Sequence, residues 1–243
     1  MLKVSETACE YQIDPLGIDS RKPRLFWKTE SDGEKQTWYR VIVASSEAEL
    51  LRGTGDLYDT GVVSSASDFY AEYRGQALTS RQKCYWKVFA GYEGGTAESG
   101  VSFFETGLDA DDWKGTWMSM PVNNQGGTTL YRKIIPVKEK EFTRVRAYVC
   151  GIGCCEVFCN GVKTDDAVLD PPITEYARRV LYRAHDLTHL MHVGDNVFGV
   201  EVAHGWFGAK KVLVQIYVDY ADGETEEFHS SVNGGWWVGG SPV

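Results

Sequence analysis

The sequence lacks the features that would place a protein at a membrane or on nucleic acid. No hydrophobic run approaches the length of a transmembrane helix, and the opening residues, MLKVSETACEYQ, contain neither the basic nor the apolar region of a signal peptide. Positive charge is in short supply, since 25 Lys and Arg face 34 Asp and Glu and the formal net charge is −9. Nucleic acids and anionic membrane surfaces require clustered Lys and Arg. We therefore expect neither partner.

The common catalytic motifs are also missing from the sequence. It contains no G-x-S-x-G, H-E-x-x-H, G-x-G-x-x-G or Walker A pattern. Among the scattered histidines of the second half, only His185 has an acidic neighbour, Asp186. Inverting glycosidases need a carboxylic acid and a carboxylate base on opposite sides of a bound sugar, and nothing in the sequence pairs two acidic residues in that way. No catalytic residue is predicted in this chain.

The six cysteines have two interpretations. Cys9 and Cys84 are far apart, whereas four others form the pattern C-x3-C-C-x3-C over residues 150–159. Thiolates are good zinc ligands, but the spacing differs from C-x2-C and the pattern crosses strand positions whose side chains face opposite ways. We favour the second interpretation, in which these cysteines serve as small buried apolar residues. Free thiols without a signal peptide predict a reducing, cytoplasmic setting.

The sequence is rich in short β patterns and in aromatic residues, which make up 13% of the chain. Residues 1–24 are predicted to be an irregular lead-in, and residues 46–52 a single helical turn with Ser45 or Ser46 as its N-cap. Short strands separated by turn signals are typical of an immunoglobulin-like sandwich. In the first half we predict strands at 25–27, 38–44, 56–63, 69–73, 80–90 and 102–106.

A short acidic segment, residues 107–112, separates this pattern from a second one that starts at Trp113. We therefore predict an all-β protein of two consecutive β-sandwiches, with domains at 1–108 and 109–243 and no helix of ordinary length. A loop is expected at 123–128 and a linking segment at 183–190.

The most informative stretch is 145–208. Its strand patterns lie at 145–150, 155–159 and 196–203, and Asn160-Gly161 closes a hairpin because both residues tolerate positive φ. A long polar loop joins these strands. Such a loop on a β scaffold fits a surface that contacts a polar ligand, but it also fits a decorated turn on a structural sandwich. Local features alone favour the second interpretation.

A resemblance to a known family bears on these two interpretations of the loop. The runs YVCGIGCCEVFCNG, VLDPPITEY, RVLYRAHDLT and GDNVFGVEVAHGWF resemble, in order and spacing, the N-terminal β-sandwich domain of bacterial α-L-rhamnosidases. Upstream, RVIVASSEAELL, GDLYDTGVV, YWKVFA and FFETGL resemble the fibronectin-III-like domain that precedes it. The resemblance implies an immunoglobulin-like or fibronectin-III-like sandwich followed by a jelly-roll-like, galactose-binding-like sandwich.

The resemblance also implies a function. In that family the catalytic acids lie in a downstream helical barrel, so we expect a non-catalytic N-terminal portion that supports such a barrel in the same polypeptide and is inactive alone. The alternative is a stand-alone carbohydrate-binding or adhesion module. Whether the reading frame continues past Val243 would separate the two.

In some members a related sandwich binds L-rhamnose with calcium, and this implies candidate site residues here. No cofactor is required, but calcium is a candidate ligand. His204 replaces an Asn of many relatives, and the segment at 170–174 lacks their Trp, so we rank an architectural role above a sugar site. For a rhamnose-containing carbohydrate the candidates are Asn160, Asp165, Asp170, Tyr176, His204 and Trp206, and for calcium they are Asp165, Asp166 and Asp170.

Two adjacent tryptophans, Trp236 and Trp237, lie near the last residue of the sequence. Neighbouring strand residues face opposite sides, so one sandwich core cannot take both rings. We expect one ring to point outward, and we expect it to be exposed or to mediate homo-oligomerisation.

Overall fold

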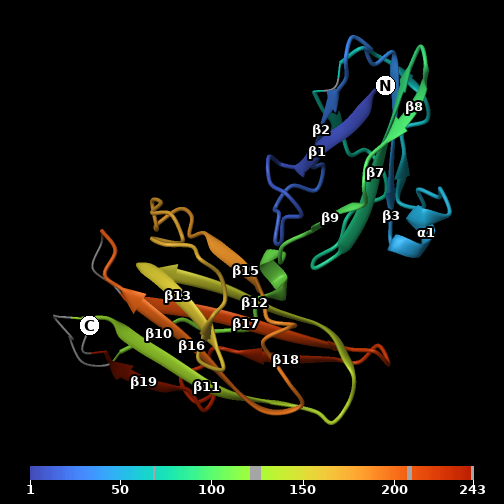
Figure 1. The fold of residues 1–243 in the computed structure, drawn as a ribbon. Coiled ribbons are helices and arrows are strands. Elements are labelled where there is room, and N and C mark those ends of the chain that lie inside the picture. The colour runs from blue at the N-terminus through green and yellow to red at the C-terminus, as the bar shows by residue number, and fades with distance from the viewer. Residues whose placement is uncertain (68, 121–126, 207–209, 242–243) are drawn as a thin grey trace. The chain divides into compact units, whose positions relative to one another are not determined.

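The computed structural model describes residues 1–67, 69–120, 127–206 and 210–241. Residues 123–126 of the predicted loop and Phe207 of the AHGWF motif lie outside the described residues. The chain forms two compact units, Met1–Asp109 and Ala110–Val243, and each is an all-β structure, as predicted (Figure 1). Among the described residues, no helix has the length and apolar character needed to cross a membrane.

The first unit contains two antiparallel sheets. One has the order β1-β2-β6, and the other has the order β4-β3-β7-β8 with β5 paired to β3 and β9 paired to β7. A buried cluster that includes Leu25, Trp27, Trp86 and Phe104 draws on both sheets. The strands are β1 Lys3–Cys9, β2 Arg24–Glu30, β3 Trp38–Ala44, β4 Tyr58–Asp59, β5 Val63–Ser64, β6 Ala71–Glu72, β7 Lys83–Tyr92, β8 Gly95–Glu98 and β9 Ser102–Glu105.

The helical turn predicted in this unit is confirmed as α1, Glu47–Leu51, in which Ser46 accepts a hydrogen bond from the amide of Glu49 at 3.2 Å. The prediction that residues 1–24 are irregular is wrong, because strand β1 lies within them and pairs with β2. A bulge between Ser5 and Ala8 interrupts the alternation of β1, and Glu6 takes a φ of +43° there. The strand predicted over 56–63 is found in two pieces, because β4 and β5 both pair with β3 and residues 60–62 between them interrupt the pairing.

The second unit is built from two five-stranded sheets. The first has the order β10-β17-β12-β15, with β18 paired to β17, and the second has the order β14-β13-β16-β11-β19. A short 3-10 helix at Ala110–Asp112 precedes them. The strands are β10 Met118–Ser119, β11 Thr129–Val137, β12 Phe142–Ile152, β13 Cys154–Cys159, β14 Val162–Lys163, β15 Tyr182–Asp186, β16 Gly194–Ala203, β17 Lys211–Tyr220, β18 Thr225–His229 and β19 Trp237–Gly240.

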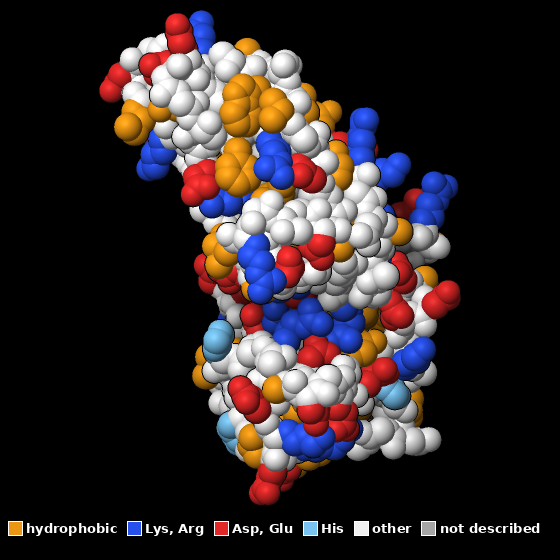
Figure 2. All heavy atoms as spheres, turned by 90° about the vertical axis from the view of Figure 1, so that its right-hand side faces the viewer, with side chains coloured by type: hydrophobic (Ala, Val, Ile, Leu, Met, Phe, Trp, Pro, Cys, Tyr) orange, Lys and Arg blue, Asp and Glu red, His pale blue; other side chains and the backbone are white. Residues whose placement is uncertain are grey.

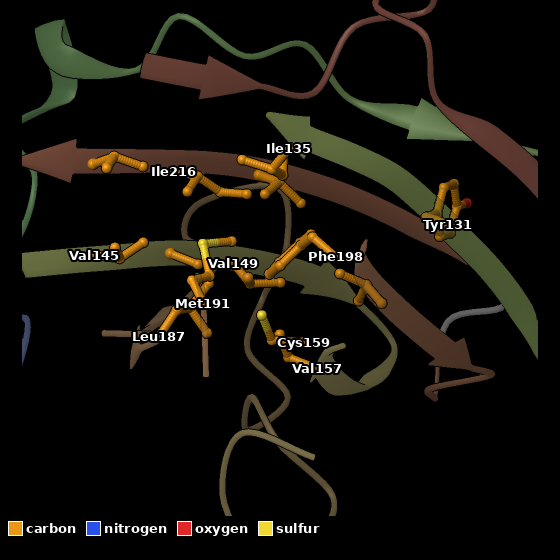
Figure 3. Close-up of a cluster of buried hydrophobic side chains, with 14 of the residues drawn as sticks. Tyr131, Ile135, Val145, Val149, Val157, Cys159, Leu187, Met191, Phe198 and Ile216 are labelled. Atoms are coloured by element: carbon orange, nitrogen blue, oxygen red, sulfur yellow. The ribbon is translucent and has the colours of Figure 1, made fainter. Parts of the chain in front are cut away.

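The core of the second unit lies between these sheets. Alternate residues of β12 and β17, such as Val149 and Ile216, meet Ile135 of β11 and Phe198 of β16 (Figure 3). Phe198 is fully buried, and burial of such a side chain stabilises a fold by roughly 2–3 kcal/mol. The alternation that the sequence shows at 145–150 and 196–203 therefore produces the packing that holds the two sheets together.

Two predictions about connections in the second unit have different outcomes. The hairpin at Asn160-Gly161 is confirmed, with φ of +50° and +82° between β13 and β14. The prediction of a linking segment at 183–190 is wrong in its first part, because residues 183–186 belong to strand β15. This strand pairs with β12, and the pairs extend from Asp186 with Arg146 to Tyr182 with Cys150. In the described sheet β15 is an edge strand, with β12 on one side and no strand on the other. Edge strands often carry polar residues, and those of β15 obscure the alternating pattern of a strand in the sequence.

Candidate functional site

The polar loop of residues 164–181 connects β14 to β15 and is fastened to β13 at two points. The amide of Thr164 donates to the carbonyl of Val157 at 2.9 Å, and the amide of Cys155 donates to the carbonyl of Asp170 at 2.6 Å. Residues 164–170 therefore run along β13, and they bring the acidic residues of the loop beside the outer strand β15.

Arg183 of β15 lies between two of the acidic residues. Its Nε is 3.3 Å from Oδ2 of Asp165, and its Nη1 is 3.4 Å from Oδ1 of Asp170. The guanidinium presents a fixed fork of donors and stays charged at any ordinary pH. One arginine thus pairs with two of the carboxylates predicted to form the site.

Asp165 has further partners in the same place. Its Oδ2 is 3.0 Å from Nδ1 of the buried His185, and its Oδ1 accepts from the amide of Ala167 at 2.9 Å. The hydrogen bond from His185, together with the Ala167 amide and the charge of Arg183, lowers the pKa of Asp165 to about 2. This carboxylate is therefore ionised at neutral pH and already held by the fold.

The calcium set predicted from the resemblance does not fit this arrangement. Ca²⁺ takes six to eight oxygen ligands, with carboxylates converging on the ion. Asp165 and Asp170 instead face the cation Arg183, and Asp166 is exposed. In the described part of the chain, no three His, Cys, Asp or Glu side chains are grouped so as to hold a metal. A guanidinium lies where a metal ion was expected.

The aromatic candidates lie at the end of the sheet where β13 begins and β16 ends, since Cys154 pairs with Ala203. A Cβ on Gly205 would lie 2.9 Å from the Cα of Gly153 and 3.6 Å from Oη of Tyr176. Glycine therefore lets the end of β16 approach this turn and Tyr176 closely. His204 and Trp206 flank Gly205 and are exposed, Trp206 by 83%. The loop carbonyl of Asp170 is fastened to the same end of β13.

Asn160 lies away from the other candidates. It follows the last residue of β13, and the six residues of that strand span roughly 17 Å. Its Nδ2 donates to the carbonyl of Leu190 and to Oδ1 of Asn196, and its Oδ1 accepts from the amide of Val197, each at 2.8 Å. The side chain is engaged in holding the hairpin, so the structure does not place it with the sugar candidates.

Comparison with known proteins decides which family these two units come from. A family model described as the Rha78A-like, N-terminal immunoglobulin domain matches residues 4–110, and one described as the alpha-L-rhamnosidase N-terminal domain matches residues 140–236. The solved alpha-L-rhamnosidase from Dictyoglumus thermophilum is 30% identical and superposes over 99% of this chain with a TM-score of 0.89. The chain carries the N-terminal domain pair of the α-L-rhamnosidases.

Curated relatives agree with this assignment. An alpha-L-rhamnosidase from Formosa agariphila is 31% identical over 86% of the chain, and one from Alteromonas sp. is 29% identical over 88%. The solved rhamnosidase from Aspergillus terreus is 22% identical and shares the fold over the whole chain, with a TM-score of 0.84. The chain spans 26% of the length of the Formosa agariphila and Alteromonas relatives and 30% of the solved Dictyoglumus and Aspergillus chains.

The cysteines of the rhamnosidase domain pair are all free. In the cluster at 150–159, Cys150 and Cys159 are buried and the other two are half-buried. Burial raises the pKa of Cys150 and Cys155 to about 12 and that of Cys159 to about 11. These thiols stay protonated at neutral pH, which favours the interpretation as small packing residues over zinc ligands.

The two tryptophans at the end of the rhamnosidase N-terminal domain face different ways, as predicted. Trp236 packs against the core, with its ring centroid 6.2 Å from that of Phe198 and its Nε1 donating to the carbonyl of His229 at 3.1 Å. Trp237, on the outer strand β19, is 56% exposed. Trp237 is therefore the outward ring.

Sequence reasoning missed Arg183 and His185 as members of the candidate site. Both stand in the run YRAHD, which carries no catalytic motif and was predicted to be a linking segment. The signal that could have revealed them is their alternation, which places both side chains on one face of a strand, beside an acidic loop.

Proposed function

We propose that this chain is the non-catalytic N-terminal portion of an α-L-rhamnosidase and supports a catalytic domain of the same polypeptide. The observation that carries the proposal is the superposition of 99% of this chain on 30% of a solved rhamnosidase, with a TM-score of 0.89. A helical barrel that supplies the acid and the base, and a rhamnose-containing carbohydrate as substrate, are parts of this proposal.

The chemistry of the candidate site supports a non-catalytic role. The general acid of a glycosidase needs a raised pKa so that it carries a proton near neutral pH. Asp165 has the opposite property, with a pKa of about 2, and it shares Arg183 with Asp170. Both carboxylates are suited to holding the loop in place through Arg183, and Asp165 is unsuited to protonating a glycosidic oxygen.

Hydrolysis of p-nitrophenyl α-L-rhamnoside tests the proposal. Residues 1–243 alone should give no turnover, and the polypeptide extended along its reading frame past Val243 should give turnover. Activity of residues 1–243 that survives repurification and disappears in Asp165→Asn or Asp170→Asn would contradict the proposal. A reading frame that ends at Val243 would favour the stand-alone carbohydrate-binding or adhesion module instead.

We further propose that the second unit contacts carbohydrate, with Tyr176, His204 and Trp206 as the contacting side chains. Supporting this is the 83% exposure of Trp206 on a segment packed beside Tyr176. Titration with L-rhamnose, followed by tryptophan fluorescence, should give a saturable change that is lost in Trp206→Ala and kept in Trp237→Ala. An unchanged signal in Trp206→Ala would leave the loop with its architectural role only.

The remaining expectations stay predictions. They are a cytoplasmic location, homo-oligomerisation through the outward Trp237, and no nucleic-acid or membrane partner. Acidic and basic side chains are interspersed over the face shown in Figure 2, and the charge of −9 works against binding to polyanions.

A further inference from the structure

The outer face of the sheet β1-β2-β6 in the first unit carries a cluster of exposed aromatic side chains. Phe26 lies at its centre, with ring centroids 4.4 Å from Tyr11, 5.9 Å from Phe69 and 5.6 Å from Tyr70. Tyr11 is 66% exposed and Phe69 is 63% exposed. Large aromatic rings with open faces usually mark a surface that binds something.

These rings border a groove of about 540 Å³, which we call the Tyr11 groove. Tyr11, Phe26 and Phe69 supply its aromatic lining, and Glu6 and Lys28 supply charged groups. Phe26 and Lys28 are alternate residues of β2, so both face outward while Trp27 between them is buried in the core. The groove therefore combines flat apolar faces with polar groups in the manner of a ligand site.

The backbone around the Tyr11 groove is held in a conformation that these residues disfavour. Glu10 and Tyr11 have φ of +47° and +65°, and hydrogen bonds of 2.8 and 2.9 Å between Cys9 and Gln12 close the turn around them. Turns of this kind usually take Asn and Gly, so a Glu-Tyr pair is strained. Glu6, at φ +43°, is turned outward by the bulge in β1. The strained positions thus present two of the side chains that line the groove.

The turn is buttressed so that Tyr11 keeps its place. The guanidinium of Arg24 lies 5.0 Å from the centre of the Tyr11 ring, and its Nη2 is 2.6 Å from Oε2 of Glu10. The amide of Arg24 also donates to Oε1 of Glu10 at 2.6 Å. A ring fixed in this way loses little conformational entropy when a ligand stacks on it.

The charged side chains point to the class of ligand. Lys28 pairs with Glu6, and Arg24 pairs with Glu10, so the charges at the groove cancel. A strongly charged ligand would find no excess of opposite charge there. A neutral ligand with many hydroxyls could use both the donors of Lys28 and the acceptors of Glu6, and could lay an apolar C–H face on the rings.

We propose that the Tyr11 groove is a carbohydrate site in the immunoglobulin-like unit, which takes one pyranose ring of a neutral sugar chain. The sugar stacks on Tyr11 and Phe69, and its hydroxyls reach Glu6 and Lys28. The choice of a sugar rests on the proposed function. The site lies on the first unit, whereas the carbohydrate contacts proposed above belong to the second, so the two are tested separately.

NMR titration of the ¹⁵N-labelled 243-residue chain tests the proposal, with methyl α-L-rhamnopyranoside and maltose as probes. We expect saturable shifts of the Tyr11 and Phe69 amides and of Nε of Arg24, with a dissociation constant on the order of 1 mM. Tyr11→Gly, which removes the ring and suits the left-handed backbone, should weaken binding about tenfold or more, equivalent to about 1.4 kcal/mol. Tyr11→Phe should keep it, and Trp206→Ala is the matched control in the other unit.

The outcomes separate this proposal from the proposed function. Saturable shifts at the groove with either probe, lost in Tyr11→Gly, support it, and binding of maltose alone would support the site while weakening the link to rhamnosides. No shift at the groove up to about 50 mM of either probe overturns it, because that is far above the expected dissociation constant. Shifts that persist in Tyr11→Gly overturn it as well. So do shifts that follow protein concentration without sugar, since a second copy would then cover the groove.

Discussion

Asp165→Asn is the most direct test of how the loop of the second unit is held. The substitution keeps the size of the side chain but removes its charge, so Arg183 loses one of its two carboxylate partners and His185 loses the carboxylate beside its Nδ1. We expect the free energy of unfolding of the second unit to fall at pH 7. The fold itself should survive, because the sheets and their core do not involve this side chain.

The magnitude follows from the pKa. The fold lowers the pKa of Asp165 from 3.8 to about 2. Each pKa unit corresponds to about 1.4 kcal/mol, which gives roughly 2.5 kcal/mol at full strength. The side chain is 26% exposed, so solvent weakens these contacts and we expect about 1–2 kcal/mol.

The pH dependence has a definite sign. A carboxyl with a lowered pKa in the folded state contributes its stabilisation above its unfolded pKa, 3.8 for Asp165, and loses it as the pH falls through the folded pKa of about 2. The difference between the wild-type chain and Asp165→Asn should therefore be constant from about pH 7 to 5, should decrease from about pH 5 downward, and should be mostly lost at about pH 2.

Urea unfolding followed by circular dichroism measures this difference, and Asp166→Asn is the matched control because Asp166 is the exposed neighbour. The control should change the unfolding free energy by less than about 0.5 kcal/mol. Equal effects of the two substitutions, or a difference for Asp165→Asn that is as large at pH 2 as at pH 7, would refute the reasoning from Arg183 and His185.

Three further predictions concern the second unit. Trp237→Ser should reduce self-association in sedimentation experiments without unfolding the unit, and a strictly monomeric wild-type chain would contradict this prediction. Trp236→Ser should destabilise the unit, because only Trp236 packs on the core. Phe198→Ala should lower the unfolding free energy of the second unit by about 3–5 kcal/mol and leave the calorimetric transition of the first unit unchanged. Loss of both transitions together would show that the units do not fold separately. Calcium at millimolar concentration should not raise the melting temperature, because Arg183 occupies the carboxylates; a rise abolished by Asp165→Asn would restore the calcium site.

The fold was predictable from the sequence wherever one face of a strand is apolar. The strand at 196–203 and the hairpin at Asn160-Gly161 were found because alternation and turn chemistry are local properties. β1 and β15 were missed for a physical reason. In β1 the bulge at Glu6 breaks the period of two, and in β15 polar residues such as His185 are buried by partners elsewhere in the sequence. A local sequence pattern cannot show which distant residues will pack against a strand.

The candidate site was harder to predict than the fold. Residue types and the resemblance singled out Asn160 and Asp165 as ligand contacts, but most hydrogen-bonding groups of both side chains are engaged within the protein. Arg183, which determines what the acidic loop can bind, was not a candidate. A sequence shows which donors and acceptors exist, whereas the fold decides which of them remain free for a ligand.

The pairing of distant strands has a consequence for synthesis on the ribosome. In the second unit β12 pairs with β17, and the residue pairs extend from Ile152 with Lys211 to Phe142 with Tyr220, so this pairing cannot be complete until residue 220 has left the exit tunnel. In the first unit β3 pairs with β7, and its last strand ends at Glu105. Sheets that depend on distant pairing form slowly, because long loops must close first. The immunoglobulin-like unit can therefore be complete while β12 of its neighbour is still a lone strand, exposed to aggregation and to chaperones.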